Sequence, residues 1–151
     1  MLTPRILAVD FGTRRIGLAV SDGLGITAQG LATLERSQLE GDLRHIAALA
    51  DEYAVERILI GNPLSASGRD NAMSLRAAAF AAKLRRHVPC PVELWDERLT
   101  SAEANRMLRG SGMGIEKRRR AVDRVAATLL LQQYLDRRAR EREEESAPVD
   151  L

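Results

Sequence analysis

The sequence is poor in several residue types, and each shortage excludes a class of protein. Among its 151 residues there is one cysteine, Cys90, so the chain has neither a disulfide framework nor a thiolate metal site. No stretch approaches the roughly 18 consecutive apolar residues of a membrane span, and the N-terminus lacks the anatomy of a signal peptide. The five aromatic residues are scattered, which argues against stacking of bases on an aromatic platform. We therefore expect a cytoplasmic protein that does not bind a membrane.

The charge of the chain is nearly balanced, but it is unevenly distributed. The sequence has 23 basic and 21 acidic residues, a net charge of +2. The last 16 residues contain four arginines and six acids, so residues 1–135 carry +4. The net positive charge of residues 1–135 suits an anionic partner such as nucleic acid. We predict one folded domain over residues 1–137 and a charged, disordered tail over 138–151.

The spacing of apolar residues predicts an α/β protein. Three strands come first, and helices and strands then alternate, which indicates a mixed five-stranded sheet flanked by helices, with three antiparallel strands followed by parallel ones. The expected strands cover residues 5–9, 15–21, 26–34, 57–60 and 92–95. The expected helices begin near residue 39, cover 71–86 and 100–110, and end with a helix over 116–136.

Three carboxylates fall at the ends or inner faces of these elements. Asp10 closes the first strand and Glu97 follows the last one, and sites in α/β sheets gather near the carboxyl ends of strands. Asp123 shares a helical face with apolar residues that should point at the sheet: Ala126, Ala127, Leu130 and Tyr134. Because a buried, unpaired carboxylate is costly, Asp123 is neutralised either by Arg119 or Arg120 or by a metal ion.

A metal ion shared by Asp10, Glu97 and Asp123 would explain all three positions. Oxygen ligands without a histidine or thiolate cluster favour Mg²⁺ or Mn²⁺. Two such ions about 4 Å apart can clamp an in-line phosphoryl displacement, one activating water and the other stabilising the leaving oxygen. The pattern predicts a metal-dependent phosphodiesterase with two ions. Taken singly, each acid also has a plainer interpretation as a turn residue or as half of an ion pair.

Four motifs together resemble the YqgF (RuvX) family. They are "DFGTRRIGLAVSD", "GNP", "DERLTSAEA" and "DRVAATLLLQQYL", and the resemblance spans about residues 5–135. Members of that family are small proteins with an RNase H-like fold, similar to bacterial Holliday junction resolvases and assigned to trimming the 5′ end of pre-16S ribosomal RNA. The resemblance implies that same fold and activity here, with the catalytic carboxylates on Asp10, Glu97 and Asp123.

Six residues near these acids are candidates for contacts with the phosphate backbone of a nucleic acid. They are Thr13, Arg14, Arg98, Lys117, Arg119 and Arg120. Each has an alternative. The run "KRRR" is typical of a solvated helix face, the first two residues of the set could simply complete a turn, and Arg98 could pair with Glu97.

Three other functions remain open at this point. A Holliday junction resolvase would use the same acids on branched DNA, and it would need a homodimer to cut two strands symmetrically. A non-catalytic module that binds RNA or a ribosome-maturation complex would not need the acids. The pattern Asp-x-Gly-Thr at Asp10 also opens the phosphate-binding hairpin of sugar kinases and actin-like ATPases, which need two such domains around the nucleotide.

Overall fold

The computed structural model describes residues 4–65, 67–96 and 114–146, and residues 115–124 among these are described as backbone only. Its strands are β1 (Arg5–Phe11), β2 (Arg15–Ser21), β3 (Ala28–Gly30), β4 (Leu34–Glu35), β5 (Val55–Asn62) and β6 (Val92–Asp96). Its helices are α1 (Leu39–Glu52), α2 (Ala72–Leu84) and α4 (Ile115–Ser146). None of the described helices has the length and apolar character needed to cross a membrane. The predicted helix over 100–110 lies outside the described residues.

The strands form one mixed sheet, as predicted. Its order is β3-β2-β1-β5-β6, with β1 and β2 antiparallel, β2 and β3 antiparallel, and β1, β5 and β6 parallel. The third strand was predicted as one piece over 26–34. It is divided instead into β3 and the short β4, which both pair with β2, so the sheet has a sixth strand.

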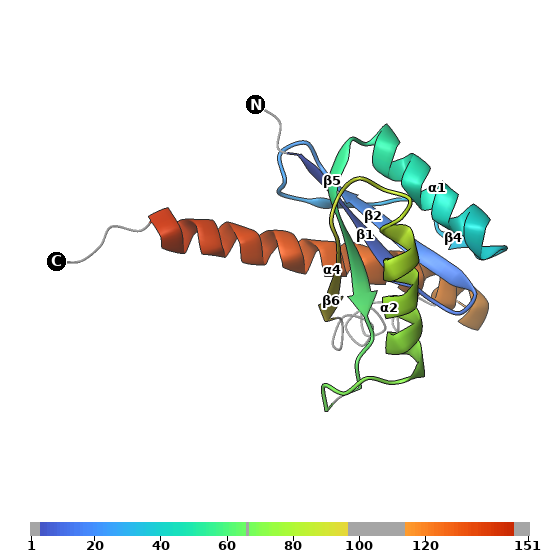
Figure 1. Cartoon of the computed structure of the whole chain (residues 1–151). Coiled ribbons are helices and arrows are strands. Elements are labelled where there is room, and N and C mark those ends of the chain that lie inside the picture. The colour runs from blue at the N-terminus through green and yellow to red at the C-terminus, as the bar shows by residue number, and fades with distance from the viewer. Residues whose placement is uncertain (1–3, 66, 97–113, 147–151) are drawn as a thin grey trace.

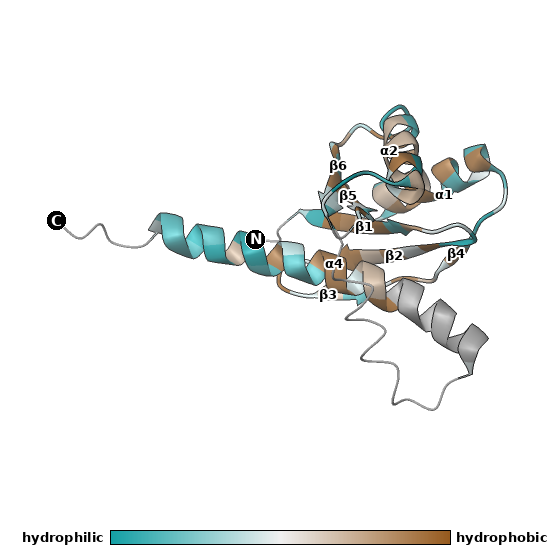
Figure 2. Cartoon of the chain, turned by 90° about the horizontal axis from the view of Figure 1, so that it is seen from below, coloured by the Kyte–Doolittle hydropathy of each residue, from teal (hydrophilic) through white to brown (hydrophobic). Residues whose placement is uncertain are grey.

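Helices cover both faces of the sheet, and this explains why its central strands are apolar without alternation. Figure 2 shows α1 and α2 on one side of the sheet and α4 on the other. Leu7 and Val9 of β1 face α1 and α2, whereas Ile6 and Ala8 face α4. Two cores result, one on each side of the sheet.

A side-chain contact joins the end of α2 to the start of α1. His87 follows α2, and its Nε2 lies 2.8 Å from a carboxylate oxygen of Glu40. Its Nδ1 lies 3.0 Å from the carbonyl oxygen of Lys83. Because both ring nitrogens face acceptors, the doubly protonated imidazolium satisfies both bonds. Glu40 accordingly raises the pKa of His87 above 6.5, and His87 lowers the pKa of Glu40 below 4.5. No pattern in the sequence predicted this contact between His87 and Glu40.

The last helix is longer than predicted. We expected it to end near Asp136, but α4 continues to Ser146. Residues 139–146 are exposed, and in Figure 1 this part of α4 projects beyond the sheet. The high charge of the segment suggested disorder, yet alanine, arginine and glutamate are strong helix formers. Arg137 and Glu141 also pair at 3.4 Å across one turn. The boundary between domain and tail at residue 137 stays a prediction.

Candidate active site at the carboxyl edge of the sheet

Three parallel strands end at the same edge of the sheet and bring polar residues there. Val9 of β1 lies beside Ile60 of β5, so Asp10 comes level with the last residues of β5. In turn, Asn62 of β5 is in register with Asp96 of β6. This edge is where ligands bind in open α/β sheets, and it is the edge at which the sequence placed Asp10.

The side chain of Asp10 belongs to the face of the sheet that α4 covers. Successive residues of a strand alternate between faces, and Val9 and Phe11 pack in the core on the opposite side. Ala8, two residues before Asp10, packs in the core under α4. Asp10 is half-buried and interacts with other groups of the protein. A site shared by β1 and α4 requires a strand side chain on the face that the helix covers, and Asp10 fulfils this requirement.

The turn that follows Asp10 is tightly constrained. The N–H of Gly12 donates to the carbonyl oxygen of Arg15 at 3.0 Å. A Cβ atom on Gly12 would lie 2.6 Å from that same oxygen, so glycine is required there on steric grounds. Arg36 donates from Nη1 to the carbonyl oxygens of Gly12 and Thr13, at 3.1 and 3.0 Å. Its guanidinium also lies 4.5 Å from the centre of the Phe11 ring.

Arg36 is a residue that the sequence analysis missed. It follows β4 directly, and its backbone N–H donates to the carbonyl oxygen of Arg14 at 2.8 Å. Its role depends on chain segments that are more than 20 residues apart, so no local pattern could reveal it. The side chains of Thr13 and Arg14 are exposed at the tip of this turn. Their proposed contact with phosphate stays a prediction.

Asn62 is the second residue that the sequence analysis missed, because no role was assigned to the asparagine of the "GNP" motif. Its Oδ1 is buried and has no hydrogen-bond partner among the described residues. Buried polar atoms are nearly always paired, and an exception calls for a water, an ion or a functional role. An amide oxygen is also one of the hard ligands that Mg²⁺ and Ca²⁺ accept.

The other predicted site residues cannot be compared with the structure in the same way. Glu97 and Arg98 follow β6 directly and lie outside the described residues. The backbone of α4 contains Asp123, four residues before the buried Ala127. It also contains the basic residues Lys117, Arg119 and Arg120. The side chains of these four residues lie outside the description.

The chemistry of the edge fits a hard divalent cation. Asp10 supplies a carboxylate on the α4 face, and Asn62 supplies an unsatisfied oxygen at the end of the neighbouring strand. Within the described side chains, no three His, Cys, Asp or Glu residues lie close enough together to hold an ion. Two of the three predicted ligands, Glu97 and Asp123, are not among the side chains so described.

The chain matches known proteins over almost its whole length. The sequence profile of RuvX, described as "Holliday junction resolvase", matches residues 4–137. A protein of Koribacter versatilis named "Putative pre-16S rRNA nuclease" is 54% identical over 140 residues, which is 93% of this chain and 92% of that protein. A protein of the same name from Halalkalibacterium halodurans is 47% identical over 135 residues, which is 88% of this chain and 96% of that protein.

Two solved structures share the fold at low sequence identity. Thermus thermophilus RuvC in complex with a Holliday junction substrate superposes with a TM-score of 0.52 and 15% identity, covering 91% of this chain and 96% of that one. The fowlpox virus resolvase in complex with Holliday junction DNA gives a TM-score of 0.51 and 14% identity, covering 88% of this chain and 97% of that one. The fold is therefore the RNase H-like fold of these resolvases.

Proposed function

Because the chain belongs to the RuvX family, we propose that it is a metal-dependent nuclease that hydrolyses phosphodiester bonds of structured nucleic acid, in the 5′-end processing of pre-16S rRNA. The observation that carries the proposal is the carboxyl edge of the sheet. The side chain of Asp10 lies there on the face that α4 covers, and the adjacent strand ends at Asn62, whose Oδ1 has no partner among the described residues. The names of the relatives support the choice of ribosomal RNA precursor as the substrate.

The proposed site assigns a role to each group. Asp10, Glu97 and Asp123 would hold two Mg²⁺ or Mn²⁺ ions, and Asn62 would add a neutral oxygen ligand or orient a bound water. The ions, when bound, would supply the activated water and stabilise the leaving oxygen. Three carboxylates that share the ions would repel one another without them, so protonation of one would compete with metal binding.

The chain's own residues would orient the substrate. Arg36 holds the carbonyl oxygens of the turn after Asp10, so the backbone around the carboxylate is fixed before the substrate arrives. Thr13 and Arg14 at the exposed tip of that turn would then contact a phosphate beside the bond that is cut. The basic run from Lys117 to Arg120 at the start of α4 would hold another part of the backbone.

The decisive experiment compares the purified protein with its Asp10→Asn variant. Each is incubated with Mg²⁺ or Mn²⁺ and a panel of pre-16S rRNA, single-stranded RNA and a four-way DNA junction. Asn keeps the shape of Asp but removes the charge, so we expect the variant to fold and bind RNA but not to cleave it. Equal metal-dependent cleavage by both proteins would refute the proposed site.

The same panel separates the alternatives. Preference for the four-way junction, with paired symmetric cuts by a homodimer, would identify a resolvase. Binding without cleavage by the wild-type protein would identify a binding module. The family description favours a resolvase as the second candidate, and the names of the relatives favour the ribosomal RNA nuclease.

A further inference from the structure

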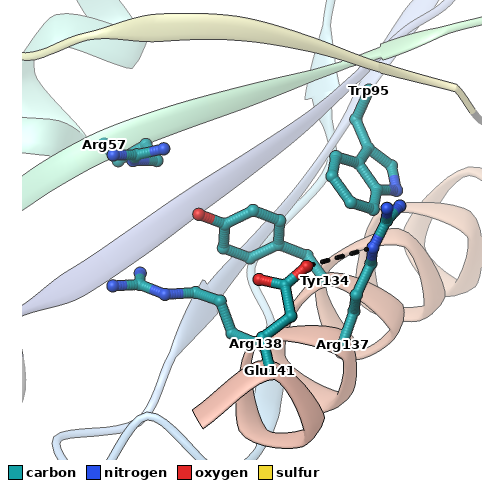
Figure 3. A pocket seen from close by; sticks show the side chains of 6 residues that line it. All are labelled: Arg57, Trp95, Tyr134, Arg137, Arg138 and Glu141. Carbon is teal, nitrogen blue, oxygen red and sulfur yellow. Dashed lines mark ion pairs between the residues drawn. The ribbon is translucent and has the colours of Figure 1, made fainter. Parts of the chain in front are cut away.

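A second polar site lies on the same face of the sheet, between the strands β5 and β6 and the helix α4. It is a cavity of about 370 Å³, shown in Figure 3. Six residues line it: Arg57, Trp95, Tyr134, Arg137, Arg138 and Glu141. Sites for small organic ligands begin at roughly 300 Å³, so the cavity can hold a group the size of a nucleotide.

The lining of this cavity offers many hydrogen-bond donors and few acceptors. Arginine and tryptophan side chains only donate, and a tyrosine hydroxyl can do so. Glu141 is the one acidic side chain among the six. The hydroxyl of Tyr134 points toward the side on which Arg57 lies (Figure 3). Such a lining suits an oxyanion, and arginine in particular binds phosphate through two parallel hydrogen bonds.

The arginines are held in place before any ligand binds. Arg57 pairs with Glu93 at 2.5 Å, and Arg137 pairs with Glu141 at 3.4 Å. The guanidinium of Arg137 lies 5.5 Å from the centre of the Trp95 ring. Side chains that are already ordered lose less conformational entropy when a ligand binds. Arg57 and Arg137 therefore have partners before a ligand binds.

Arg138 supplies a positive charge that the two ion pairs of the cavity do not neutralise. Its guanidinium lies 5.8 Å from the centre of the Tyr134 ring. Among the residues that the structure describes, no carboxylate lies within ion-pair distance of it. Arg138 also lines a smaller hollow beside Gly25 and Arg142, so it stands between two openings on the surface.

The cavity extends away from the proposed active site along α4, from Trp95, which is two residues before Glu97, to Arg138. Arg137 follows Asp123 by 14 residues on α4, which corresponds to about 21 Å along the helix axis. Figure 1 shows that α4 begins on the side where β1 turns into β2 and then runs away from it. Phosphates of one strand in duplex DNA recur about every 3.4 Å along the axis. A strand of nucleic acid that follows α4 over this distance would therefore reach Arg138 several nucleotides from the active site.

We propose that this cavity is a second substrate-binding site, which holds a phosphodiester of the nucleic-acid strand several nucleotides from the bond that is cut. The inference rests on the proposed nuclease function and adds to it a minimum length of substrate. Arg57 and Arg138 bind the phosphate oxygens, and Tyr134 donates from its hydroxyl. Arg137 keeps its contacts with Trp95 and Glu141 and forms one wall of the cavity.

The test uses full-length protein with Asp10→Asn, so that substrate is bound and not cut, and a fluorescently labelled RNA. Arg138→Gln is compared with Arg140→Gln, a matched control because Arg140 is exposed on the same helix and lines neither hollow. We expect Arg138→Gln to weaken binding and to lower the slope of log K against log salt by about 0.7 on a single strand or about 0.9 on a duplex. Arg140→Gln should match its parent. Melting temperatures of both variants verify folding.

Shortened substrates then locate the contact. The effect of Arg138→Gln should disappear once the RNA is shortened, on one side of the cleavage site, past the nucleotide whose phosphate the cavity holds. Equal binding by the two arginine variants would overturn the proposal, and so would an effect that survives every shortening. Tight saturable binding of a free nucleoside monophosphate or of an acidic peptide at Arg138 would also overturn it, because the site would then serve another ligand.

Failure of the proposed function gives a different result. If wild-type protein binds RNA through Arg138 but does not cleave it with either metal, the nuclease assignment fails and the cavity stands only as an RNA-binding site. If wild-type protein cleaves RNA and Arg138→Gln behaves as Arg140→Gln does, only the second site fails.

Discussion

The turn after Asp10 gives the sharpest test of how the fold supports the site. Gly12→Ala places a Cβ atom 2.6 Å from the carbonyl oxygen of Arg15, a backbone atom, whereas ordinary contacts begin at 3.4 Å. The two must separate by about 0.8 Å. The same oxygen accepts the N–H of Gly12 at 3.0 Å, and the added separation takes this bond beyond hydrogen-bonding distance.

The expected cost follows from the bonds at risk. A neutral hydrogen bond contributes about 1 kcal/mol net, and one to a charged group about 1.5–3 kcal/mol. A bond to a charged group is at risk here because the guanidinium of Arg36 donates to the carbonyl oxygen of Gly12. Loss of both destabilises the protein by about 3 kcal/mol, which for a chain of this size lowers the melting temperature by roughly 6–12 °C.

The assay is thermal unfolding followed by circular dichroism, with Gly41→Ala as the matched control. Gly41 lies within α1, and an added Cβ there meets nothing within 4 Å. The control should therefore gain up to about 1 kcal/mol in stability, because alanine favours a helix more than glycine does. A melting temperature of Gly12→Ala within experimental error of wild type would refute the reasoning. Its cleavage rate should fall as well, since Asp10 is two residues away.

Three further predictions concern groups elsewhere in the fold. Asn62→Leu should stabilise the metal-free protein by about 1–2 kcal/mol, because a buried unpaired oxygen is removed, and should reduce cleavage; unchanged cleavage would contradict its role. His87→Gln should lower the melting temperature most below pH 6.5, and the difference from wild type should shrink as pH rises through the raised pKa of His87, where its bond to Glu40 loses its charge. A pH-independent difference would refute this. The double variant Arg119→Ala and Arg120→Ala should lower the salt dependence of RNA binding. An unchanged slope of log K against log salt in a filter-binding titration would show that this basic run is a solvated helix face that does not contact RNA.

The sequence by itself determined the elements whose signal is local. Apolar runs that are covered on both faces identified β1, β2 and β5, because both sides of a central strand must be buried. Helical periodicity found α1, and an alanine-rich stretch predicted the helix over 71–86. The structure shows that Asn71 is the N-cap of α2, where its side chain accepts from the N–H of Ser74 at 2.9 Å. Asp10 was found because a carboxylate at the end of a buried strand is unusual.

Local signals failed where two effects competed. The charge-rich end of the chain suggested disorder, but its helix propensity and its i,i+4 pairs extend α4 to Ser146. The predicted strand over 26–34 is interrupted after Gly30, because its pairing with β2 resumes only at Leu34. In both cases the sequence pattern found the element but misplaced its boundary.

Only the tertiary structure decided which distant groups meet. Arg36 holds the turn at Gly12 across 24 residues, and His87 reaches Glu40 across 47. Whether the side-chain oxygen of Asn62 has a partner among the described residues depends on the elements around it, and the arginine-lined cavity brings together Arg57 and Arg138, which are 81 residues apart. A sequence pattern records periodicity within one element. Which side chains face each other across elements is set by strand register and helix packing, and these form only when the whole chain folds.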